Sequence, residues 1–110
     1  MVRKKETPRE RLLRRHMELC KRAIEIMEAK NRDYGADEDP FRNFRSFGAL
    51  GILVRLSDKL ARMRGYIERG QLAVSDETFL DTGIDAINYV VLLLTILEFG
   101  DECNGGKTTI

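Results

Sequence analysis

The last third of the chain contains the segment that most restricts the fold. Residues 76–94 read DETFLDTGIDAINYVVLLL, with several carboxylates at first and almost only apolar side chains afterwards. From Ile87 onward, apolar residues would cover nearly every side of a helix, which indicates burial all round. A domain of three helices leaves such a helix one neighbour short. We therefore expect the same helix of a second subunit to complete a bundle.

Two earlier segments have the period of an amphipathic helix. The first begins with Thr7, Pro8 and Glu10, a capping box with proline at the first helical position, and should end near Lys30. Its predicted inward stripe is Leu13, Met17, Cys20, Ile24 and Met27. The second covers residues 51–69, and its predicted stripe is Leu53, Leu56, Leu60, Met63 and Ile67. Gly70 is a typical residue just beyond a helix end.

The last segment should form the third long helix. Ser75 is a suitable N-cap, and the predicted stripe is Leu80, Ile84, Ile87, Val91 and Leu94. The sequence thus predicts an all-α fold, a helical bundle of three long helices plus a short one around residues 46–50, completed by oligomerisation. We expect a basic N-terminal arm over residues 1–7, a single all-α domain over residues 8–101 and a flexible tail over residues 102–110. Residues 31–44 form a long loop of the kind that is usually functional or disordered.

Charge and cysteine content bear on where in the cell the protein is located. The net charge of the 110 residues is +1, but residues 1–22 carry nine basic side chains and three acidic ones. Cys20 and Cys103 are far apart and lack zinc-binding spacing, which favours a reducing, cytoplasmic location. The charged N-terminus has no signal-peptide pattern, and the apolar run over residues 86–97 is too short to cross a bilayer, so we expect no membrane association.

The acidic start of the last helix is a candidate metal site. Glu77, Asp81, Asp85 and Asn88 are spaced by four, four and three residues and would lie on one side of the helix. Like charges four residues apart repel, and Mg²⁺ or Mn²⁺ between Asp81 and Asp85 would relieve that repulsion. On the first helix, Glu25 and Glu28 are placed to join the same site. Alternatively, basic side chains of neighbouring helices neutralise a solvated acidic edge.

Two basic segments are candidates for phosphate binding. In KNRDYG, Lys30 would contact phosphate and Tyr34 would stack on a base; the alternative is a structural helix end. In RLSDKLAR, residues 55–62, basic side chains surround Asp58 on the side of the helix opposite its apolar stripe. They are Arg55, Lys59 and Arg62. These side chains would bind phosphate groups or, alternatively, form ordinary ion pairs on the helix surface. The basic N-terminus would touch nucleic acid or be a solvated face.

The motifs KNRDYG, NF…G, RLSDKLAR and DETFLDTGIDAINY, in this order, resemble the nucleotide-modification-associated domain of phage and bacterial genomes. The resemblance covers residues 18–97. More distantly, the chain is similar to MazG-like all-α nucleoside triphosphate pyrophosphatases and dimeric dUTPases, which hold Mg²⁺ with an ExxE pair and a later ExxD pair. Glu25 and Glu28 match the first pair, and Asp81 and Asp85 the second. Ile24 stands where the family has a second glutamate, and the Asp81–Asp85 spacing is four rather than three.

The resemblance implies a homodimer or homotetramer that binds a (deoxy)nucleoside triphosphate with Mg²⁺ or Mn²⁺ in the cytoplasm, or in the host cytoplasm for a phage protein. If it is an enzyme, it is expected to hydrolyse the nucleotide to the monophosphate and pyrophosphate. The expected metal and catalytic residues are Glu25, Glu28, Asp81 and Asp85. The expected substrate contacts are Lys30, Asp33, Tyr34, Asp58, Lys59, Arg62 and Asn88. The alternative is a non-enzymatic adaptor in DNA modification or phage defence that binds nucleic acid or protein through residues 1–22.

Overall fold

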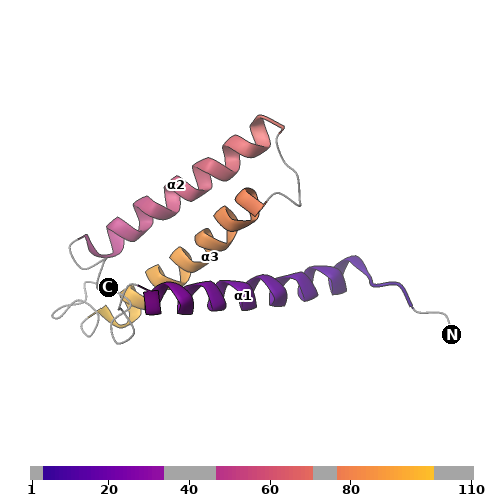
Figure 1. The fold of residues 1–110 in the computed structure, drawn as a ribbon, viewed down its shortest axis with the longest axis horizontal. Helices are drawn as coiled ribbons and strands as arrows, with labels where there is room; N and C mark the ends of the chain where they lie inside the picture. The colour runs from indigo at the N-terminus through magenta and orange to yellow at the C-terminus, as the bar shows by residue number, and fades with distance from the viewer. Residues whose placement is uncertain (1–3, 34–46, 71–76, 101–110) are drawn as a thin grey trace.

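The structure is a computed structural model that describes residues 4–33, 47–70 and 77–100, without the side chains of residues 31–33 and 77. Within these ranges it contains three helices and no strand: α1 (Pro8–Asp33), α2 (Gly48–Glu68) and α3 (Glu77–Glu98) (Figure 1). The all-α prediction is therefore confirmed. Of the short helix expected around residues 46–50, residues 48–50 are the first turn of α2, so no separate helix forms there.

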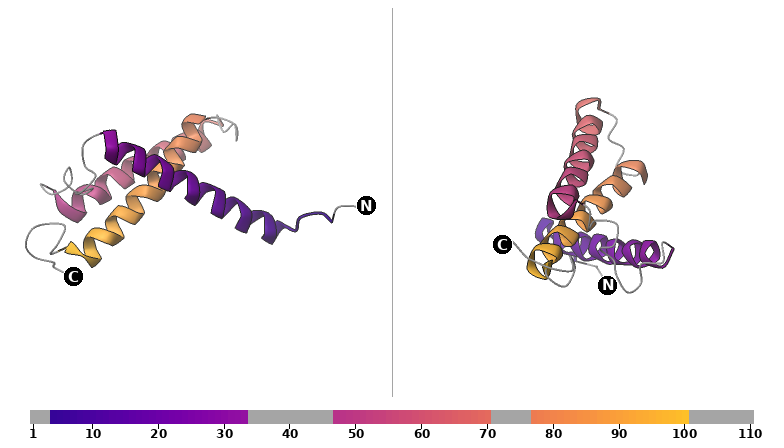
Figure 2. Two further views of the ribbon diagram at one scale, coloured as in Figure 1. Left: turned by 60° about the horizontal axis from the view of Figure 1, so that its bottom comes forward. Right: turned by 90° about the vertical axis from the view of Figure 1, so that its left-hand side faces the viewer.

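Helices α2 and α3 lie side by side and run in opposite directions, whereas α1 crosses α3 (Figures 1 and 2). The first turns of α1 extend away from the other two helices (Figure 1). The centre of the α2–α3 contact is formed by Ile52 and Ile96, which are almost completely buried. Partly buried apolar side chains surround them: Ala49, Tyr89, Leu92, Leu93 and Leu97. The molecule consists of a tight helical pair with a third helix laid across it.

The local signals at the helix ends are confirmed. The Glu10 amide donates to Thr7 Oγ1 at 3.1 Å, and the Thr7 amide donates to Glu10 Oε1 at 2.9 Å, so the capping box is complete. Gly70 follows α2 with φ +66°, a conformation that favours glycine. Ser75, the expected cap of the last helix, lies outside the described residues.

The predicted inward face of α1 is largely wrong. Leu13, Met17 and Ile24 are 53%, 74% and 59% exposed. The side of α1 that packs on α3 instead contains Ala23, which is buried. A small residue at this position lets the two helices approach closely, and the Asn88 amide donates to the Ala23 carbonyl at 3.0 Å.

The inward faces of α2 and α3 are also rotated relative to the prediction. On α2, Ile52 and Leu56 are buried, whereas Leu60 and Ile67 are exposed. On α3, Ile84 is buried as expected, but the later stripe residues are exposed. They are Val91 and Leu94. The sequence predicts the positions of the helices correctly. It does not predict which side of each helix is buried, because each helix has apolar residues on more than one side.

Helix α3 is long and apolar enough over Thr78–Glu98 to cross a membrane, as judged by length and composition alone. The apolar run over residues 86–97, which alone is too short to cross a bilayer, is part of this longer helix. A core helix of a soluble protein passes the same test, and α3 packs against both α1 and α2. One such helix does not show membrane association.

Candidate functional site

The three helices meet at Asp85. Lys30 from α1 places its Nζ 3.3 Å from Asp85 Oδ1, and Lys59 from α2 places its Nζ 3.0 Å from Asp85 Oδ2. The exposed fractions of the side chains are 23% for Asp85, 20% for Lys59 and 55% for Lys30. Each carboxylate oxygen therefore contacts a different ammonium group. We call these three residues the lysine–aspartate junction.

The helical period explains why the two lysines reach the same point. Lys59 is three residues after Leu56, so it lies on the buried side of α2 and its aliphatic stem covers apolar surface. Lys30 is two turns after Ala23 and shares the side of α1 that faces α3. The prediction that Lys59 lies opposite the packed side of α2 is therefore wrong.

Asp81 and Asn88 continue the contact between α1 and α3 on either side of the junction. Arg22 Nη2 lies 3.6 Å from Asp81 Oδ1, with both side chains at least half exposed. Asn88 uses its amide to bind the backbone of α1. Asp81 and Asp85 are thus paired with basic side chains of α1 and α2, as in the alternative to a metal ion.

The described carboxylates do not gather into a metal-binding cluster. No group of three or more histidine, cysteine, aspartate or glutamate side chains in residues 4–30, 47–70 and 78–100 is placed to hold a metal ion. Glu25 and Glu28 are exposed on α1 and form no such group with Asp81 and Asp85. Any metal binding at the junction would use fewer protein ligands than the four expected.

The remaining predicted substrate contacts are Asp33, Tyr34, Asp58 and Arg62. Asp58 and Arg62 are exposed on α2. Arg62 lines an open cavity of about 480 Å³ with Tyr66 and Arg69, and Arg69 lies over the Tyr66 ring at 5.6 Å. Tyr34 and the side chain of Asp33 lie outside the described residues.

A second cavity, which sequence reasoning missed, lies between all three helices. It has a volume of about 380 Å³ and a mostly apolar lining. The lining residues are Arg15, Leu19, Met63, Phe79, Leu80, Gly83, Ile84 and Ile87. Gly83 contributes no side chain, and a Cβ there would lie 3.6 Å from Met63 Cε, an ordinary contact distance. The only signal in the sequence was a glycine within an apolar helical stripe.

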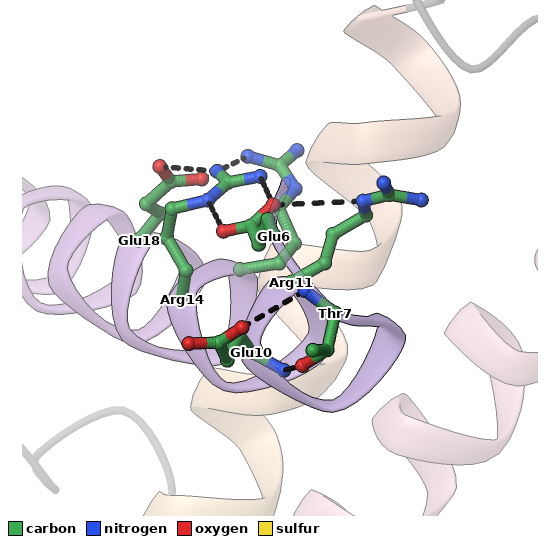
Figure 3. A network of polar contacts seen from close by, with 7 residues as sticks. Glu6, Thr7, Glu10, Arg11, Arg14 and Glu18 are labelled. Atoms are coloured by element: carbon green, nitrogen blue, oxygen red, sulfur yellow. Dashed lines mark hydrogen bonds and ion pairs between the residues drawn. The ribbon is translucent and has the colours of Figure 1, made fainter. Parts of the chain in front are cut away.

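The start of α1 carries a separate network of charges (Figure 3). Arg14 contacts Glu6 at 2.7 Å and Glu18 at 2.9 Å, and Arg15 contacts Glu18 at 3.2 Å. Hydrogen bonds from Arg14 lower the pKa of both glutamates, and the same contacts raise the pKa of the Arg14 guanidinium. Part of the basic N-terminal surface is therefore already paired within the chain, which weakens the case for a polyanion-binding face.

A comparison of the chain with protein-family models, with curated proteins and with solved structures found no match. What the chain does is therefore inferred from its own residues.

Proposed function

We propose that the chain binds a (deoxy)nucleoside triphosphate together with Mg²⁺ in the cytoplasm and hydrolyses it to the monophosphate and pyrophosphate. The observation that carries the proposal is the lysine–aspartate junction. Two ammonium groups from different helices lie within 3.3 Å of one carboxylate. A polyphosphate chain needs such a concentration of positive charge at a single place.

The junction supplies cations that a ligand can take over. Lys30 is half exposed and Lys59 has a flexible stem, so both ammonium groups can move from Asp85 to phosphate oxygens. A triphosphate carries several negative charges, whereas Asp85 carries one, so the phosphate groups attract the two ammonium groups more strongly. In the absence of nucleotide, Asp85 keeps the two lysines close together against their mutual repulsion.

The carboxylates at the junction suit Mg²⁺ that binds as a complex with the nucleotide. Mg²⁺ is usually held by one or two carboxylates together with substrate phosphates, so a cluster of three is not required. Asp85 and Asp81, one turn apart on α3, would hold it once the lysines contact phosphate, without the Glu25 and Glu28 that the sequence also predicts as ligands. The ion would supply neutralisation of phosphate charge and activation of water.

Thermal melting of the full chain with each common dNTP, with and without Mg²⁺, tests the proposal. A ligand of the folded state raises the Tm by mass action. We expect a rise in Tm that requires both Mg²⁺ and nucleotide. The apparent affinity for the nucleotide, obtained from the dependence of Tm on its concentration, should be at least tenfold lower in Lys30→Gln. Lys21→Gln is the matched control on an exposed side of α1 and should bind normally. No rise with any dNTP would overturn the proposal.

A nucleotide that raises the Tm would then be assayed for release of pyrophosphate. Release that is lost in Asp85→Asn, with melting in the absence of ligand measured in parallel, supports hydrolysis. Binding without release leaves a nucleotide-binding module. A rise in Tm with duplex DNA that disappears on removal of residues 1–7 would instead support the adaptor function.

The proposal includes a homodimer or homotetramer of MazG-like helices. Fourteen large apolar side chains among the described residues are at least 40% exposed, and only five apolar residues there are buried. Soluble proteins rarely leave so much apolar surface in water, which supports burial between subunits.

A further inference from the structure

His16 and Cys20 lie one turn apart on α1 and contact each other. The Nδ1 atom of His16 is 3.4 Å from the Sγ atom of Cys20. His16 is exposed and Cys20 is partly exposed, so ions in solution can reach both side chains. We call these two residues the histidine–cysteine pair. It is separate from the lysine–aspartate junction, because Lys30 follows Cys20 by ten residues, about 15 Å along the helix axis.

The two side chains are suitable ligands for one zinc ion. Zn²⁺ binds thiolate sulfur at about 2.3 Å and imidazole nitrogen at about 2.0–2.1 Å, usually in tetrahedral geometry. Two such ligands of one ion lie about 3.5 Å apart, as follows from these bond lengths and the tetrahedral angle. Because Sγ and Nδ1 are 3.4 Å apart, one ion can bind both atoms without a change in the helix.

The adjacent turns on this side of α1 carry no charge that would repel a cation. The residues three and four positions before His16, and three and four positions after Cys20, are all apolar. They are Leu12, Leu13, Ala23 and Ile24. Arg15 precedes His16 directly, but its guanidinium contacts Glu18 at 3.2 Å. Lys21 follows Cys20 directly and therefore points about 100° away around the helix.

From this geometry we infer that the histidine–cysteine pair is a binding site for one Zn²⁺ ion. When the ion binds, the thiol gives its proton to the solvent and the neutral imidazole donates the lone pair of Nδ1. Water occupies the two remaining tetrahedral positions. Two protein ligands hold the ion less tightly than the four of a structural zinc site, so it exchanges with the solvent.

The inference does not rest on the proposed function. Mg²⁺ with a nucleotide requires the carboxylate oxygens of α3, whereas sulfur and imidazole ligands favour Zn²⁺. The two sites therefore differ in ligands, in metal and in place on the chain, and each can be removed without the other.

Calorimetric titration with Zn²⁺ provides the first test. The full chain carrying Cys103→Ser is the parent, because it keeps Cys20 as its one thiol. We expect one ion per chain. Cys20→Ser and His16→Gln should each lower the affinity at least about tenfold, since even an outer-shell partner of a metal ligand contributes that much. Asp85→Asn should bind Zn²⁺ as the parent does. No binding by the parent, undiminished binding by Cys20→Ser, or loss in Asp85→Asn alone would overturn the inference.

A displaced histidine is the matched control for the spacing. His16→Gln combined with Lys21→His keeps one imidazole on α1 but moves it about 100° around the helix from Cys20. This double variant should bind Zn²⁺ no better than His16→Gln alone. Recovery of the parent affinity would show that the four-residue spacing is not what holds the ion, and would contradict the assignment.

Absorption with Cd²⁺ as the probe identifies the sulfur ligand directly. Cd²⁺ bound to thiolate absorbs in the ultraviolet through sulfur-to-metal charge transfer, and carboxylate-bound Cd²⁺ does not. We expect this band to saturate at one Cd²⁺ per chain in the parent and to be absent in Cys20→Ser. Circular dichroism without metal shows that the variant is folded, which is expected because Cys20 is partly exposed. Cd²⁺ binding without the band would place the ion elsewhere and overturn the inference.

Discussion

Lys59 on α2 lies 3.0 Å from Asp85 on α3, with only 20% of the lysine side chain exposed. Because Lys30 contacts the other oxygen of the same carboxylate, Asp85 joins all three helices. An ion pair that is largely removed from water is costly to break from one side, since the remaining charge loses its partner.

Asp85→Asn should therefore destabilise the protein. Two ammonium groups would remain close together without a counter-charge, and we expect a loss of about 1–2 kcal/mol in the free energy of unfolding, below the range for fully buried pairs because the site is partly solvated. Urea denaturation measures it. Asp81→Asn is the control: its pair with Arg22 is exposed and 3.6 Å long, so the loss should stay below about 0.5 kcal/mol. Equal losses would contradict the role of Asp85.

Asn88→Asp should loosen α1 from α3. The change removes the donor to the Ala23 carbonyl and puts a negative charge 3.0 Å from an oxygen that cannot donate. Loss of a part-buried hydrogen bond between helices costs about 0.5–1.5 kcal/mol, and repulsion between the new carboxylate and the carbonyl oxygen adds to this cost. Amide hydrogen exchange should accelerate in α1 around Ala23 and stay unchanged near Ile52, in the α2–α3 contact. Uniform acceleration in all three helices would argue against a local effect.

Thr7→Ala should fray the start of α1. The change leaves the Glu10 amide without its side-chain acceptor, and losses of an N-cap cost about 1 kcal/mol. Thr7→Ser keeps the hydroxyl and should behave like the parent. Far-ultraviolet circular dichroism during urea denaturation reports the difference, which would be absent if the cap contributed nothing.

The stability of α1 should depend on pH in the acidic range. Hydrogen bonds from Arg14 lower the pKa of Glu6 and Glu18, and bonds from Thr7 lower that of Glu10, all below their ordinary value of 4.5. A lowered pKa in the folded state means that this stabilisation is complete above about pH 4.5 and is lost as the pH falls through the folded values. Helical content from pH 7 to pH 3 should show the loss. Arg14→Gln should give a smaller change, and an identical profile would disprove the assignment.

Gly70→Ala and Gly65→Ala should have opposite effects. Gly70 has φ +66°, where a Cβ costs about 1–2 kcal/mol. Gly65 lies inside α2, and the nearest atom to an added Cβ is the mobile end of Arg69 at 2.8 Å, so alanine should gain up to about 1 kcal/mol from its higher helix propensity. Thermal melting of both variants provides the comparison. Two changes of the same sign would contradict it.

Local patterns predicted the helices better than their packing. Thr7 and Glu10 make a cap from four consecutive residues, and Gly70 ends a helix through its own backbone freedom, so neither depends on the rest of the chain. The inward side of α1 was mispredicted because the helix has two apolar sides. Periodicity identifies both Ala23 and Ile24 as candidates and does not say which one α3 covers.

The sequence predicts which residues belong to the candidate site, but it does not predict which of them contact one another. Lys30, Lys59 and Asp85 were each expected to contribute, yet Lys59 was placed on the outer side of α2 because a lysine counts as polar in any hydropathy pattern. Its long aliphatic stem lets it lie on the packed side and still reach a carboxylate. Which carboxylate it reaches depends on how the helices cross, which spacing within one helix does not define.

The charge network at the start of α1 also affects the order in which the chain folds. The contacts among Glu6, Thr7, Glu10, Arg14 and Glu18 each join residues at most eight positions apart, so no other helix is needed to form them. A helix of 26 residues with such local support exceeds the length at which helices are marginal in water. Helix α1 can therefore acquire its structure on the microsecond scale of helix formation, before slower tertiary contacts are made. The packing of α1 on α3 is then a later step, in which a helix that has already formed docks on its neighbour.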